Sequence, residues 1–179
     1  ENNTEDDENV LKTDDGFKYT VEDDEVTIKG YEGSKTTLTI PNEIDGKKVT
    51  KIGANAFDGN TSITSVEIQD GITTIDSYAF YNATALESVS IPESVTIMNE
   101  GAFANCTALS SVNLPSKLKT ISYGLFASCS NLTKIEIPEG VTSIDGYAFY
   151  TCTSLKEINI PEKVESIGEA AFYYCAALE

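Results

Sequence analysis

The sequence predicts a repeat solenoid in which each 23-residue coil contributes one short strand to a parallel β-sheet, with a β-hairpin cap at the N-terminal end. The first observation behind this prediction is a phenylalanine that recurs every 23 residues without a slip, at Phe57, Phe80, Phe103, Phe126, Phe149 and Phe172. The second is a short apolar run in the same register, followed in most coils by proline. A unit of this length cannot bury an apolar face by itself, so each unit must stack on its neighbours.

The apolar run of each coil has the alternation of a strand that buries one face. In the last complete run, Leu155, Ile158 and Ile160 precede Pro161, which stops the strand. Equivalent runs lie at residues 63–68, 86–91, 109–114 and 132–137. We therefore expect one strand per coil, paired in parallel with the equivalent strand of the next coil.

The remainder of each coil is predicted to return along the opposite side of the stack. In the coil around Phe149, Val141 and Ile144 indicate a short extended or turn-like piece, and the dipeptide at 145–146, Asp-Gly, indicates a tight bend. We interpret residues 148–152 as a single helical turn.

The N-terminal part departs from the repeat. Phe17, Tyr19 and Val21 alternate, as do Val26 and Ile28 after an acidic turn, which predicts a hairpin that covers the first coil. We divide the chain into an acidic leader at residues 1–15, predicted to be disordered, a cap at residues 16–40, and about six repeats at residues 41–179, the last incomplete. The first repeat carries extra residues at 43–48.

The C-terminal end shows no matching cap. Two interpretations stay open, a longer array cut short or an uncapped coil that makes end-to-end contact with a partner. The final Leu178-Glu179 fits either the repeat or a cloning remnant.

The repeated columns resemble a known family. The patterns Leu-x-x-Ile-x-Ile-Pro, Val-Thr-x-Ile and Ala-Phe-x-x-Cys over residues 34–179 are similar to the BspA-like, Treponema-type leucine-rich repeat. The resemblance implies a right-handed leucine-rich-repeat superhelix. It also implies a secreted or surface-exposed bacterial protein with a role in adhesion and no enzymatic activity.

Charge and composition narrow the partners. The formal net charge is −17, the chain has no arginine, and residues 1–25 hold 11 of the 29 acidic residues. This balance argues against nucleic acid as a partner, and the lack of a long apolar run argues against membrane insertion. The acidic runs at 5–8, 14–15 and 22–25 supply oxygen ligands of the kind that calcium prefers, but they lack the spacing of a calcium-binding loop, so a solvated leader is favoured.

The reactive side chains also point away from catalysis. The four cysteines share one repeat column with Asn60 and Ala83, at Cys106, Cys129, Cys152 and Cys175, which predicts buried free thiols and neither disulfides nor a metal site. Histidine is absent, which removes the commonest general base and the usual activation of serine or cysteine nucleophiles. We predict a chain that is not an enzyme and has no cofactor.

Surface recognition is the remaining function. The outward columns of the predicted strands are small and polar, and they supply a candidate binding surface at Glu67, Ser90, Asn113, Glu136, Asn159, Lys134 and Glu157. A second candidate is a tyrosine column next to the repeated phenylalanine, at Tyr81, Tyr150 and Tyr173, although covering the core edge is its favoured role. We expect a binding module for a host or microbial surface protein or a glycan; the alternative is a structural spacer that holds other domains away from the cell.

Overall fold

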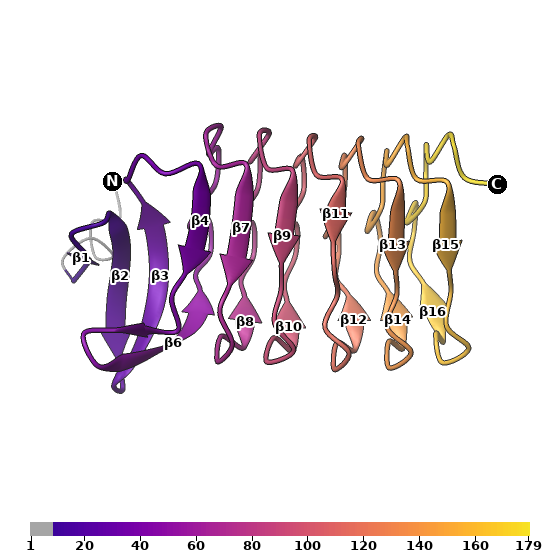
Figure 1. Ribbon diagram of the computed structural model, residues 1–179. Helices are drawn as coiled ribbons and strands as arrows, with labels where there is room; N and C mark the ends of the chain where they lie inside the picture. The colour runs from indigo at the N-terminus through magenta and orange to yellow at the C-terminus, as the bar shows by residue number, and fades with distance from the viewer. Residues whose placement is uncertain (1–8) are drawn as a thin grey trace, which may run out of the picture.

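The computed structural model describes residues 9–179 as an elongated stack of coils with two ladders of short strands along its length (Figure 1). The first ladder forms the strand face and contains β4 (Thr37–Ile40), β7 (Ser65–Ile68), β9 (Ser88–Ser90), β11 (Ser111–Val112), β13 (Lys134–Glu136) and β15 (Glu157–Asn159). Successive strands pair in parallel at an offset of 23 residues within the repeats, as Ser65 with Ser88 and Ser88 with Ser111, except that β11 and β13 belong to separate sheets. The predicted parallel stack is confirmed, although each strand is shorter than its apolar run.

A second ladder, which the sequence did not predict, runs along another side of the coils. It begins at β6 (Lys47–Ile52) and continues through two-residue strands, β8 (Thr74–Ile75), β10 (Ile97–Met98), β12 (Thr120–Ile121), β14 (Ser143–Ile144) and β16 (Ser166–Ile167). In β8, β12 and β14 the isoleucine is buried and its polar neighbour is half-buried. The coil therefore contains two strands where one was expected, because the short extended piece pairs with its own copy in the next coil.

The third side of each coil is a turn edge, and the helical turn predicted there is wrong. No helix is assigned within residues 9–179. Successive amides alternate between a carbonyl three residues back and a carbonyl of the next coil: Tyr78 N donates to Glu100 O at 2.9 Å and Tyr81 N to Tyr78 O at 3.0 Å. Left-handed residues recur within this edge, such as Tyr147 with φ 59° and Thr151 with φ 57°, and they prevent a helix from forming.

The repeated phenylalanines form one continuous stack through the core. Neighbouring rings lie 4.8 to 5.7 Å apart between centroids, with interplanar angles of 3° to 15°. The rings from Phe57 to Phe149 are buried, and Phe172 in the last coil is half-buried. Rows of leucine, isoleucine and valine from both ladders surround the stack and complete a single core.

The cysteines lie beside this stack as free thiols. Each Sγ donates to the carbonyl oxygen of the phenylalanine in the preceding coil, at 3.1 to 3.2 Å. Burial raises the pKa of Cys106 and of Cys152 to about 12, and it also raises the pKa of Cys129 well above its usual range. Cys175 is only half-buried.

The N-terminal end of the core is closed by antiparallel strands. β2 (Phe17–Glu22) and β3 (Glu25–Tyr31) form a hairpin, and β3 pairs in parallel with β6, so the hairpin extends the second ladder. The extra residues of the first repeat form β5 (Glu43–Ile44), which turns into β6 through Asp45 and Gly46, both with positive φ.

Two of the sequence-based boundaries need correction. The disordered leader is wrong for the part that the structure describes, because β1 (Leu11–Lys12) pairs with β2 and the Thr13 hydroxyl accepts a bond from Phe17 N. Residues 1–8 lie outside the described residues. The cap boundary at residue 40 assigns β4 to the cap, whereas β4 pairs in parallel with β7 as a strand of the repeat ladder.

The continuous phenylalanine stack predicts a large effect of removing one ring from its middle. Phe103→Ala should lower the free energy of unfolding by about 3–5 kcal/mol, because it removes buried area and leaves a cavity between two coils. Chemical denaturation measures the effect. A matched truncation at the half-buried end, Phe172→Ala, should cost less, and equal costs at both positions would contradict a stack whose stability depends on neighbours.

The left-handed turn residues predict a stabilising substitution. Thr151 is β-branched and has φ 57°, while Asn82 and Asn105 hold the same column in other coils and bond to each other at 3.0 Å. Thr151→Asn should raise the free energy of unfolding by about 1 kcal/mol, since asparagine tolerates this conformation better. Thr153→Asn, which lies outside the left-handed region, is the control and should have no comparable effect in urea denaturation.

The burial of the thiols predicts their order of alkylation. Iodoacetamide in mildly alkaline solution should modify Cys175 first in the folded protein, because the thiolate reacts and burial suppresses it at the other three positions. Mass spectrometry of peptides locates the label. Four alkylated cysteines are expected after unfolding without a reductant, and labelling of Cys129 as fast as Cys175 would overturn the buried assignment.

Candidate functional site

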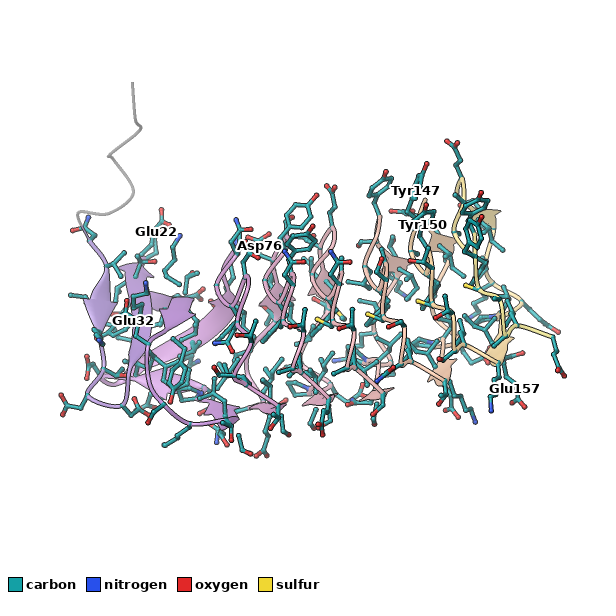
Figure 2. The ribbon with its side chains drawn as sticks, turned by 90° about the horizontal axis from the view of Figure 1, so that it is seen from above. Glu22, Glu32, Asp76, Tyr147, Tyr150 and Glu157 are labelled. Atoms are coloured by element: carbon teal, nitrogen blue, oxygen red, sulfur yellow. The ribbon has the colours of Figure 1, made fainter. Side chains whose placement is uncertain are left out.

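The strand face carries the first set of predicted site residues in exposed positions. Glu67 and Ser90 are register partners in β7 and β9, and Glu136 and Asn159 are register partners in β13 and β15. Lys134 is likewise opposite Glu157. The predicted tyrosine column lies elsewhere: Figure 2 shows its member Tyr150, next to Tyr147, at the edge of the stack opposite Glu157. The two predicted sets are therefore separate surfaces.

Both strand ladders are interrupted at the same junction between coils. β11 is the last strand of one sheet and β13 the first of the next, and the second ladder breaks in the same way between β10 and β12. Figure 1 shows a wider space between these strands than between their neighbours. We call this interruption the seam.

The turn edge stays closed across the seam. Gly101 N donates to Tyr123 O at 2.9 Å, Phe103 N to Leu125 O at 3.0 Å and Asn105 N to Ala127 O at 2.7 Å. The coils therefore remain joined on one side and lose their backbone hydrogen bonds on the two strand sides.

Polar side chains replace or extend backbone hydrogen bonds beside the seam and across it. On the paired side, the Asn113 amide donates to Ile91 O at 2.7 Å and accepts from Ile91 N at 3.1 Å, which ties the end of β11 back to the coil of β9. Across the seam, a side-chain bond joins the coils of β10 and β12. The Ser122 hydroxyl donates to Met98 O at 2.5 Å. In other coils the equivalent carbonyl accepts a backbone amide, as Ile121 O does from Asp145 N at 2.8 Å.

A further link crosses the seam from the opposite end of β12. Ser116 donates to the Glu93 carboxylate through its hydroxyl at 2.6 Å and through its amide at 2.9 Å. These bonds hold the pKa of Glu93 below its usual range.

A groove opens on the strand face where the seam separates the strands. Its larger part has a volume of about 720 Å³ and is lined by Leu114, Ser116, residues 134–140 and residues 157–159. An adjoining hollow of about 390 Å³ lies between residues 110–114 and 133–136. We call the two together the seam groove.

The groove combines an apolar floor with a charged and polar rim. Leu114, Ile135 and Ile158 are buried or half-buried, whereas Lys134, Glu136, Glu157 and Asn159 are exposed. The Lys134 ammonium lies 3.2 Å from the Glu136 carboxylate, and both side chains are exposed, so a ligand at the rim can reach them. This arrangement can donate to and accept from hydroxyl or amide groups while apolar area packs below.

The structure brings some of the predicted residues together and leaves others apart. Asn113, Lys134, Glu136, Glu157 and Asn159 line the seam groove. Glu67 and Ser90 lie on β7 and β9, beyond the residues that line the groove. Sequence reasoning missed the floor and the proline loop, namely Leu114, Ser116 and residues 137–140. One local signal could have found part of this region, because Ser116 stands in a column that carries Glu93, Glu139 and Glu162 in other coils.

Two structural findings concern metals and membranes. In residues 9–179 no group of three or more acidic, cysteine or histidine side chains is arranged to hold a metal ion. The same part of the chain has no helix of the length and hydropathy needed to cross a bilayer.

Comparison with known proteins assigns the family. The model of the BspA type leucine rich repeat region matches residues 47–179 in six copies. No curated protein sequence matches the chain. Among solved structures, the leucine-rich repeat protein of Treponema pallidum is 26% identical, with 94% of this chain and 91% of that one covered and a TM-score of 0.83.

Two longer proteins share the fold. A leucine rich cell surface protein of Faecalibacterium prausnitzii is 31% identical over 95% of this chain and 53% of its own, with a TM-score of 0.71. A leucine-rich repeat protein of Eubacterium ventriosum is 29% identical over 87% and 49%, with a TM-score of 0.68. The chain thus spans about half the length of each. With six matched repeats and the same solenoid in its relatives, the chain belongs to the BspA-type leucine-rich repeat family.

Proposed function

We propose that the chain is a non-enzymatic binding module of a secreted or cell-surface bacterial protein, and that the seam groove recognises a protein or a glycan. The observation that carries this proposal is the groove itself, because it joins an apolar floor to exposed polar groups at the junction where both ladders open. Recognition sites commonly combine a mostly apolar surface with a few convergent polar groups.

The fully paired part of the strand face offers a contrast that supports placing the binding site at the seam groove. Glu67, Ser90 and Thr39 continue the same columns toward the N-terminus, where β4, β7 and β9 are fully paired. The Thr39 hydroxyl also donates a hydrogen bond to the Glu67 carboxylate at 3.5 Å, so these two side chains have each other as partners. The paired region presents side chains on a continuous sheet, whereas the seam adds depth.

A surface location is supported by the relatives. The Faecalibacterium prausnitzii protein is described as a cell surface protein, and it is 31% identical to this chain. The competing function is a spacer that holds other domains away from the cell, for which the continuous core and stacked coils are equally suitable.

Binding to arrays of matrix proteins and glycans tests the module. We expect saturable binding by the purified chain, and a triple variant of the groove rim, Lys134→Ala with Glu136→Ala and Asn159→Ala, should bind at least about tenfold more weakly. These exposed side chains bear no backbone contacts across the seam, so thermal unfolding should be little changed.

The matched control removes the same columns away from the seam, with Thr39→Ala, Glu67→Ala and Ser90→Ala. Unchanged affinity in this control assigns binding to the groove. An equal loss in both variants would instead point to the whole strand face, and absence of binding by the unmodified chain would favour the spacer.

A further inference from the structure

The turn edge, on the side of the coils away from the seam groove, contains a second hollow. Two columns on this edge carry tyrosine in the outer coils, Tyr78 with Tyr81 and Tyr147 with Tyr150. The two coils between them carry glycine and alanine in the same columns, at Gly101, Ala104, Gly124 and Ala127. The missing rings leave a hollow of about 210 Å³, which we call the notch, lined by Tyr78, Glu100, Gly101, Ala104, Tyr123, Gly124, Ala127 and Tyr147.

The first wall of the notch is held in place by its contacts. A Cβ at Gly101 would lie 2.5 Å from the Tyr78 ring, so the ring lies over this glycine and leaves no room for a side chain there. The Tyr78 hydroxyl donates to the Glu100 carboxylate, and this bond raises the pKa of Tyr78.

The other wall is a chain of tyrosines. Tyr123 and Tyr147 lie 5.4 Å apart between ring centroids, and Tyr147 and Tyr150 lie 5.2 Å apart. Tyr123 is 48% exposed, although it is a large aromatic side chain. The rings thus support one another and still present area to solvent.

The charges around the notch are negative and have no cationic partner within residues 9–179. Glu100 lines the notch, and the charge of Glu169 raises the pKa of Tyr147. Neither carboxylate belongs to an ion pair in the described part of the chain, and no lysine lines the notch. Aromatic faces beside carboxylates attract a cation. The formal net charge of −17 also favours a cationic ligand over an anionic one.

The volume of the notch limits the size of the cationic group that it can hold. Pockets for whole small molecules usually measure about 300–1,000 Å³, and 210 Å³ is smaller. One side chain of a larger partner fits this space. Lysine matches it in two parts, because its aliphatic stem can pack on the glycine and alanine floor while its ammonium meets the tyrosine rings and Glu100.

We propose that the notch docks a lysine side chain of a protein partner and so forms a second binding surface of the module. Tyr81, Tyr150 and Tyr173 flank the notch along the turn edge, and Tyr150 stacks on Tyr173 at 5.5 Å. Tyrosine is enriched among the residues that dominate protein interfaces. This proposal stands independently of the seam groove, which lies on a different side of the coil.

Titration of the isotope-labelled chain with a peptide containing one lysine, acetyl-Gly-Gly-Lys-Gly-Gly-amide, tests the proposal by NMR. The backbone amides of Gly101 and Gly124 report on the floor. We expect saturable shifts of both amides, and none with the same peptide carrying norleucine, which keeps the stem and lacks the charge. Tyr123→Ala and Glu100→Gln should each weaken binding about tenfold or more.

Two control variants match these substitutions outside the notch. Tyr174→Ala removes a tyrosine that is 63% exposed and does not line it, and Glu165→Gln removes an exposed carboxylate from another side of the coil. Both should leave the lysine affinity unchanged. Equal shifts with the norleucine peptide, or equal losses in the control variants, would overturn the proposal, as would the absence of saturable shifts in the unmodified chain.

Discussion

The structure depends on one constraint: every coil must place the same side chain in the same position as the coil before it. Only then do the backbone groups of one coil find partners in the next and the phenylalanine rings stack at about one strand spacing. The spacing of 4.8 to 5.7 Å between the rings satisfies both requirements at once. The buried thiols meet the same condition, since each donates to a carbonyl of the preceding coil.

The two candidate surfaces arise where this regularity is relaxed. At the seam the ladders open on two sides, and Ser116 and Ser122 supply side-chain bonds. At the notch the backbone stays regular, and the variation lies only in the side chains, where Gly101 and Gly124 interrupt the tyrosine column. One surface therefore results from a change in pairing and the other from a change in residue size.

The two surfaces also differ in their electrostatics. The seam groove combines Lys134 with three carboxylates, at Glu136, Glu139 and Glu157, and an amide at Asn159. In the notch the one charged lining residue is Glu100, beside three tyrosine rings. A partner with mixed polar groups suits the first, and a cationic side chain suits the second, so one module can contact two different chemistries on separate sides of the same coils.

The sequence by itself determined the solenoid, the 23-residue register, the parallel strand ladder, the N-terminal hairpin and the free thiols, because these follow from columns that recur in every coil. Tertiary structure decided the second ladder and the turn edge, where left-handed residues such as Thr151 replace the expected helical turn. It also decided which polar residues share a groove. Glu67 and Glu136 occupy the same repeat column. Their surroundings differ because β7 is paired on both sides, whereas β13 has lost its pairing with β11. No single repeat encodes this difference, since it depends on hydrogen bonds between coils.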